Sequence, residues 1–305
     1  MTGRAETRAR AQPSHAEIQH IPSTQCAEIA RIASGRIPGK PHSTVNQTWH
    51  APCMGNSTSP MGEQQENETM KQPNGYILYS GPSLLDGAPI VAIGTGFAGA
   101  SANPKTGDMI QVWILRQDIA PHLAIHTGDD ASVCGNCPLR GAIVAGRNIK
   151  RECYVRTFQA PNSVWKKYKR DGYPILDTYS RFAGRKVRLG AYGDPAAIPK
   201  QYLQAAVNAS AGITGYTHQY ASSPEYSTVT MASADNSKSR AAAKALGFRT
   251  FRVMRKNETL EAGEILCPAS KEAGVKTNCA KCGLCNGNPP SSRKRPVPDI
   301  AIYIH

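Results

Sequence analysis

The sequence predicts an α/β protein, either a partial (β/α) barrel or an open parallel sheet, with a β-rich beginning and a disordered N-terminal tail. Three observations support this fold class. Residues 1–75 lack apolar periodicity, residues 76–116 contain short apolar runs between turn residues, and residues 186–254 alternate between strand-like and helix-like patterns. Hydrophobic residues form 40% of the 305-residue chain, enough for one sizeable core, while 27 Gly and 22 Pro indicate many loops.

The first 75 residues are crowded with Gln, Ser, Thr, Asn and Pro. A segment of this composition buries too little apolar surface to offset the conformational entropy lost on ordering. We therefore expect a disordered tail over 1–75, an α/β metal-binding core over 76–288, and a linker with a possible terminal strand over 289–305.

The part after the tail begins with three expected strands, GYILYSG (75–81), PIVAIGTG (89–96) and MIQVWILR (109–116), which are separated by Gly, Pro and Asp. A helix is expected over PNSVWKKYKRDG (161–172). Asn162 or Ser163 is its candidate N-cap, and Gly172 is its candidate stop.

Strands and helices then alternate along the chain. The expected strands are KVRLGAYGD (186–194), GITGYTHQ (212–219), YSTVTMASA (226–234), FRTFRVM (248–254) and DIAIYIH (299–305), and the expected helices are PKQYLQAAVNAS (199–210) and SKSRAAAKALG (237–247). Such alternation is typical of parallel βαβ units with right-handed crossovers.

The sequence shows neither a secretory signal nor an apolar run of the roughly 20 residues that a membrane span requires. We therefore expect a cytoplasmic protein without a membrane partner. In a reducing compartment, nine cysteines are more often metal ligands or catalytic groups than disulfides.

The late cysteine group is the strongest chemical signal. Cys279, Cys282 and Cys285 form a CxxCxxC run, and Cys267, followed by Pro268, stands twelve residues before it. A period-three run with a remote Cys-Pro is typical of iron–sulfur clusters, whereas structural zinc usually takes two separated CxxC knuckles. The spacing therefore favours one iron–sulfur centre, with zinc or free redox thiols as alternatives.

The early cysteine group consists of Cys134 and Cys137, in CGNCP, and Cys153, sixteen residues later. Three thiolates leave one coordination position open, as in reactive metal sites, and His126 or His218 would complete a zinc site instead. A rival arrangement places Cys134 and Cys137 together with Cys282 and Cys285 as the two knuckles of a single zinc site. Cys26 and Cys53 have no partners at ligand spacing and are expected to be ordinary thiols.

The net charge of +14 is concentrated in residues 138–190, which hold 13 basic and 3 acidic residues. Aromatic residues are interleaved with this charge, the mixture that contacts phosphates and stacks on bases. We expect this basic segment to bind nucleic acid or another polyanion; the alternative is a solvated face over aromatic core residues. The candidate contacts are Arg140, Arg156, Lys166, Lys167, Lys169 and Arg170.

Two catalytic candidates stand where parallel sheets place their chemistry, at the carboxyl ends of strands. Asp194 follows one expected strand in Gly-Asp-Pro, and His218 ends the next. Asp194 also fits a turn, where it would only cap the helix that follows. Glu225 and Asp235 are further candidates of the same kind.

Five stretches together resemble an uncharacterised phage and prophage protein family: CGNCPLR, RECYV, GAYGDPAAIP, GYTHQY and ILCPAS…CAKCGLCNG. The resemblance covers about residues 76–288. That family is similar to phage proteins described as degenerate radical-SAM-like barrels, which implies a partial (β/α) barrel and an iron–sulfur centre. Radical-SAM enzymes carry CxxxCxxC in one loop, and the early group departs from that pattern, which speaks against the use of S-adenosylmethionine.

Two functions follow from these features. The first is an enzyme in which the early cysteines hold a cluster with an open iron, the late cysteines hold an auxiliary cluster, and the basic segment guides a polyanionic substrate. The second is a zinc-stabilised module that binds nucleic acid without catalysis. The two functions differ in the metal that the cysteines bind, which is iron in the first and zinc in the second.

Overall fold

The computed structural model describes residues 72–99, 103–288 and 297–304, all within one compact unit of the chain, residues 67–305. Most of the expected tail and of the linker lies outside the described residues, as do Cys26 and Cys53. Gly75, the last residue of that expected tail, already begins the first strand. In the part of the chain described, no helix is both long and apolar enough to cross a membrane.

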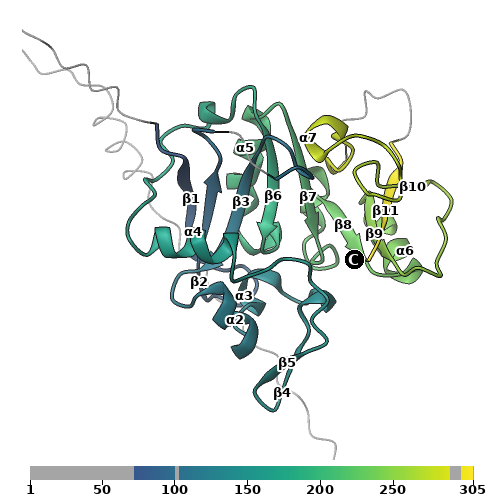
Figure 1. Cartoon of the computed structure of the whole chain (residues 1–305), viewed down its shortest axis with the longest axis horizontal. Coiled ribbons are helices and arrows are strands. Elements are labelled where there is room, and N and C mark those ends of the chain that lie inside the picture. Colours follow the sequence, from purple (N-terminus) through teal and green to yellow (C-terminus); the bar gives the residue numbers. More distant parts are fainter. Residues whose placement is uncertain (1–71, 100–102, 289–296, 305) are drawn as a thin grey trace, which may run out of the picture. The chain divides into compact units, whose positions relative to one another are not determined.

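Among the described residues, nine strands form one open sheet in the order β1-β2-β3-β6-β7-β8-β9-β11-β10 (Figure 1). The first three strands pair antiparallel, and every pairing from β3 to β10 is parallel. The α/β class with a β-rich beginning is thus confirmed, whereas the described strands do not close into a barrel. Their bounds are β1 Gly75–Pro82, β2 Pro89–Thr95, β3 Met109–Arg116, β6 Lys186–Tyr192, β7 Gly212–Thr217, β8 Met231–Ala234, β9 Thr250–Met254, β10 Glu264–Leu266 and β11 Asp299–Tyr303.

The two long helices of the parallel half cover one face of the sheet. Helix α5 (Lys200–Ala209) packs Leu203 and Ala206 into the same apolar cluster as Val187 and Leu189 of β6. Helix α6 (Ser237–Ala245) contacts β8 and β9, and its N-terminus carries a capping box formed by Asn236 and Ser239. The strands from β6 to β11 therefore have one face under helices and one face left for other segments.

Three helices and a hairpin fill the connection between β3 and β6. Their bounds are α2 Pro121–Thr127, α3 Ala131–Cys134, β4 Ala142–Val144, β5 Arg147–Ile149 and α4 Ala160–Tyr168. In Figure 1 the hairpin and α2 lie below the sheet, and α4 crosses in front of it. Helix α4 starts at Ala160 with Pro161 in its first turn, so Asn162 is not its N-cap; the Asn162 side chain instead contacts His122 at 3.1 Å.

The expected strand over 226–234 is only partly correct, because β8 begins at Met231. Residues Pro224–Thr228 form a 3-10 helix instead. Tyr226 is buried there, and its hydroxyl donates a hydrogen bond to the Ile198 carbonyl at 2.6 Å. This anchor requires a compact turn, which overrides the β-propensity of the Thr-Val-Thr run.

Candidate functional site

All seven cysteines of the early and late groups line one cavity of about 520 Å³. The cavity lies on the sheet face that α5 and α6 leave free. Alternate residues of the parallel strands point into it, among them Arg188, Tyr216 and Phe251. The two cysteine-bearing segments cover this face, so residues far apart in sequence meet at one site.

The late group is assembled from two segments that β11 and the loop before β3 hold in place. The backbone N–H of Cys267, directly after β10, donates to the Ala301 carbonyl of β11 at 2.8 Å. Helix α7 (Cys279–Cys282) contributes two cysteines, and its first N–H, that of Cys279, donates to the Lys105 carbonyl at 2.9 Å. Gly283 ends α7 with a φ of 65°, a left-handed conformation that favours glycine.

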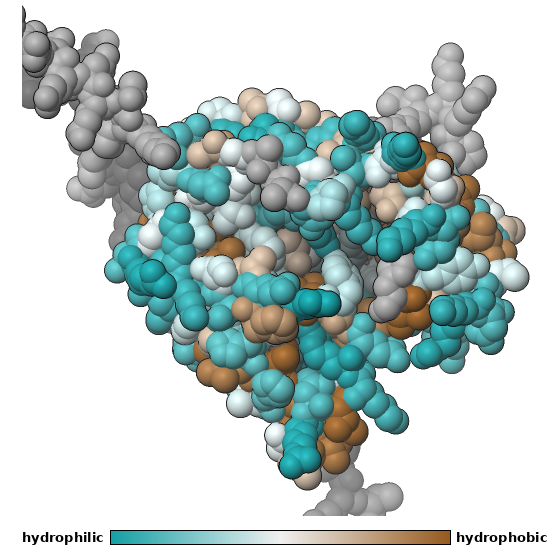
Figure 2. All heavy atoms as spheres, viewed as in Figure 1, coloured by the Kyte–Doolittle hydropathy of each residue, from teal (hydrophilic) through white to brown (hydrophobic). Residues whose placement is uncertain are grey.

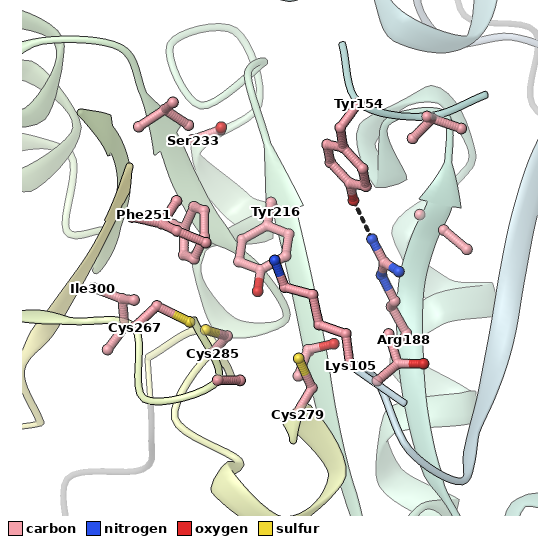
Figure 3. A pocket seen from close by; sticks show the side chains of 18 of the residues that line it. Lys105, Tyr154, Arg188, Tyr216, Ser233, Phe251, Cys267, Cys279, Cys285 and Ile300 are labelled. Carbon is pink, nitrogen blue, oxygen red and sulfur yellow. Dashed lines mark hydrogen bonds between the residues drawn. The ribbon is translucent and has the colours of Figure 1, made fainter. Parts of the chain in front are cut away.

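The sulfur atoms of the late group face a shared space. Figure 3 shows the Cys267 and Cys285 sulfurs directed toward each other, with Cys279 entering from α7. Burial raises the pKa of Cys267 and Cys279, and it raises the pKa of Cys285 to about 12 even though the Tyr216 hydroxyl hydrogen-bonds its sulfur. These buried thiols are neutral at pH 7 unless a metal or a cation displaces the proton.

The early group forms around a tight turn between α3 and the hairpin. Cys134 ends α3, and the N–H of Cys137 donates to its carbonyl at 3.3 Å. Gly135 has a φ of 58°, and a Cβ there would lie 2.4 Å from the Gln219 side chain, so CGNC requires glycine at this position. The N–H of Cys153 donates to the Leu139 carbonyl at 2.9 Å, which fixes the third cysteine beside the first two.

Burial and nearby acidic groups raise the pKa of a thiol in the early group. Burial raises the pKa of Cys134 well above its usual value, and Asp130, Cys137 and Cys153 raise it further. In the late group, the pKa of Cys285 is raised further by Cys267, Cys279 and Cys282.

His218 lies beside the early group, whereas His126 is exposed and outside the cavity. The His218 ring nitrogen Nε2 lies 3.9 Å from the Cys137 sulfur and 3.4 Å from the Asp235 carboxylate. Burial lowers the pKa of His218, but these two contacts outweigh it and raise the pKa to about 10. His218 is thus the candidate histidine that lies beside the early group.

Asp194 lines the cavity but is occupied by structural hydrogen bonds. Its carboxylate accepts from the N–H of Ala196 at 2.9 Å and from the N–H of His218 at 2.8 Å. Burial raises its pKa, although these hydrogen bonds act in the opposite direction. The cap expected as the alternative reading is therefore present, and the same carboxylate fixes the backbone that carries His218. Glu225 is exposed outside the cavity.

The basic segment divides into structural and exposed parts. Arg140 is bound to Asp130 at 2.6 Å and to the Gly128 carbonyl. The other five candidate contacts are exposed, and of the aromatic residues Tyr154 and Phe158 are exposed, while Tyr173 and Phe182 are in the core. The hairpin β4–β5 adds exposed Ile143, Val144 and Ile149. Apolar side chains gather at the bottom of Figure 2, where this hairpin lies.

Sequence reasoning did not single out two cations of the cavity, Arg188 and Lys105. Arg188 donates to the Tyr154 hydroxyl. Burial raises the pKa of Cys279, and the positive charges of Arg188 and Lys105 only oppose that rise. Arg188 stood in the sequence only as one of many basic residues. The signal available in the sequence was that Arg188 lies within an expected strand, two residues before Gly190.

Within the described residues, no three His, Cys, Asp or Glu side chains are already arranged around a common point as ligands of one metal ion. Comparison with known proteins adds no relative: no family model, no curated protein and no solved structure matches this sequence.

Proposed function

We propose that this protein is an iron–sulfur enzyme with one cluster bound by Cys267, Cys279, Cys282 and Cys285. The observation that supports it best is the single cavity lined by all seven cysteines of the two groups. A purely structural metal site is closed by its own ligands, whereas these thiols face a space large enough for a small molecule.

The donor set fits such a cluster. Four thiols, two of them buried, lie at one wall, and the Tyr216 hydroxyl hydrogen-bonds one of the sulfurs. Hydrogen bonds to cluster sulfurs and burial are the means by which proteins set reduction potentials. When bound, a cluster of this kind supplies one-electron transfer.

The early group is the proposed second site. Cys134, Cys137 and Cys153 offer three sulfurs, and His218 stands next to the position that they leave open. Asp194 acts as a positioning residue, because its hydrogen bonds hold the backbone of His218. Asp235 contacts the His218 ring and orients it.

A partial (β/α) barrel of the radical-SAM-like kind, as found in phage and prophage proteins, is part of this proposal. Strands β6, β7, β8 and β9 follow one another in both sequence and space, and the two crossover helices lie on the same face. This winding is that of (β/α) barrels, where chemistry sits at the carboxyl ends of the strands. Gly190–Asp194 and His218 occupy such ends.

Anaerobic purification with metal analysis and a visible spectrum tests the proposal. We expect a brown protein with iron and inorganic sulfide, and Cys282→Ser should lower the content by about one cluster per chain. The substitution should also increase protease cleavage beyond Gly263, because metal binding energy is folding energy for this loop. Cys53→Ser is the matched control and should change neither. A colourless protein with stoichiometric zinc would contradict the proposal.

A second candidate function is a zinc-stabilised module that binds nucleic acid in the cytoplasm. The exposed cations at the end of α4 favour it, since Lys166 and Arg170 have no carboxylate partner among the described residues. Exposed Phe158 and Tyr154 nearby offer rings on which bases can stack. Salt-dependent binding to single-stranded DNA, with zinc and no iron in the protein, would favour this function over the first.

A further inference from the structure

Arg188 is a half-buried arginine that lines the cavity, and its partners differ from those of the buried Arg252 and Arg240. Arg252 pairs with Glu264 at 2.6 Å, and Arg240 pairs with Asp299 at 2.9 Å. Arg188 takes part in no ion pair among the described residues; its hydrogen bond goes to the Tyr154 hydroxyl. Arg188 is partly withdrawn from water and has no counter-charge among the described residues, so an anion bound beside it would stabilise it.

The guanidinium of Arg188 also has donors left for a ligand. A guanidinium carries five N–H donors in a planar fork, which matches a carboxylate or a phosphate. Lys105 brings a second positive charge to the same wall and is likewise without an ion pair among the described residues (Figure 3). The two cations lie between Tyr154, next to Cys153 of the early group, and Cys279 of the late group.

The facing part of the cavity is apolar and aromatic. The rings of Tyr216 and Phe251 pack against each other with centroids 4.5 Å apart, and Ile300 and Ile302 lie beside them. The volume of about 520 Å³ is in the range of small-molecule sites. The cavity therefore combines a cationic end with an apolar, aromatic wall.

We propose that this cavity binds a small anionic ligand with an aromatic body, whose carboxylate or phosphate is held by Arg188 and Lys105 between the two cysteine groups. The inference deepens the proposed function, because it names the substrate class of the same site. The anionic head would sit at the cations, and the aromatic body would lie along Tyr216 and Phe251.

Calorimetric titration of the metal-loaded full chain tests this with two matched probe pairs: adenosine 5′-monophosphate against adenosine, and benzoate against benzyl alcohol. The first pair tests the phosphate head and the second the carboxylate. We expect at least one anionic probe to bind more tightly than its neutral match. Arg188→Gln should weaken that probe about 10- to 100-fold, the range for losing hydrogen bonds to a charged group, without changing the neutral match.

Arg185→Gln is the matched control, since Arg185 lies three residues earlier and pairs with Asp108 outside the cavity at 2.7 Å. It should leave all affinities unchanged. Tyr154→Phe keeps the test valid if Arg188→Gln does not fold: Tyr154 is 68% exposed, and losing its hydroxyl should weaken the anionic probe alone.

Equal affinity for anionic and neutral probes, or no binding of either anion, would overturn the inference. So would an Arg188→Gln protein that binds anions normally but has lost metal, because Arg188 would then serve as the counter-charge of the late thiolates. Metal content is measured separately. If the purified chain holds no metal but still prefers the anionic probe, and Arg188→Gln removes that preference, the proposed iron–sulfur function is refuted and the anion site is supported.

Discussion

Replacing Glu264 with Gln should destabilise the fold strongly, because it breaks the most buried ion pair among the described residues. The Arg252 guanidinium and the Glu264 carboxylate make two hydrogen bonds, at 2.8 and 2.6 Å, and their side chains are 1% and 0% exposed. Glu264→Gln keeps the shape of the side chain and removes its charge. The arginine is then left buried without its main counter-charge.

Removing one partner of such a pair lowers the free energy of unfolding by about 3–5 kcal/mol. Two further carboxylates remain near Arg252, Glu261 at 3.8 Å and Glu258 at 4.0 Å, and both are more exposed. They offset part of the loss, so we expect about 3 kcal/mol. For a domain of this size that corresponds to a fall in Tm of roughly 6–12 °C.

Urea unfolding followed by circular dichroism measures the change. Asp177→Asn, in the exposed pair with Arg181, is the control and should leave the unfolding midpoint nearly unchanged. The double change Arg252→Met with Glu264→Leu should recover most of the loss, since apolar replacements of a buried pair are often neutral. A loss below about 1 kcal/mol for Glu264→Gln would refute this reasoning.

Two further predictions concern charge. Burial raises the pKa of Asp299, but Lys244 at 2.7 Å and Arg240 at 2.9 Å, with other contacts, lower it overall. A carboxyl with a depressed folded-state pKa stabilises the fold above its unfolded pKa of about 4 and loses that contribution as the pH falls through the folded value. In a pH series of urea unfolding midpoints, Asp299→Asn should therefore reduce the fall of the midpoint at acid pH. An unchanged fall at acid pH would contradict this prediction. Replacing four cations of the basic segment with Ser should reduce the slope of log affinity for single-stranded DNA against log salt by up to about 3, whereas an unchanged slope would identify a solvated surface. The four are Lys166, Lys167, Lys169 and Arg170.

The alternating part of the fold was predictable because apolar runs and turn residues are local signals. The strands β1, β2, β3, β6, β7 and β9 lie where the sequence predicts them. Strand β10 was not predictable, since three residues give too short a pattern, and it forms only by pairing with β11. The same holds for the hairpin β4–β5, whose strands are also three residues long and largely exposed.

The cysteine groups were predictable from their spacing, but their meeting at one cavity was not. That juxtaposition depends on which face of the sheet each loop covers, a property set by long-range packing. Arg188 illustrates the limit. Lys186, Arg188 and Gly190 alternate with apolar residues in β6, the pattern expected of a strand with one face in solvent. In the structure that face is closed over by the cysteine segments, so the same pattern marks a cavity wall.

The position of β11 determines when the late group is completed during synthesis. Cys267, Cys279, Cys282 and Cys285 all precede β11 in the sequence, yet β11 lies between β9 and β10 and accepts the hydrogen bond from the Cys267 N–H. A nascent chain that already carries all four sulfurs therefore still lacks the strand that positions one of them. Cluster insertion into the proposed centre would consequently follow translation of β11, and a ribosome stalled before Asp299 would present an unassembled site.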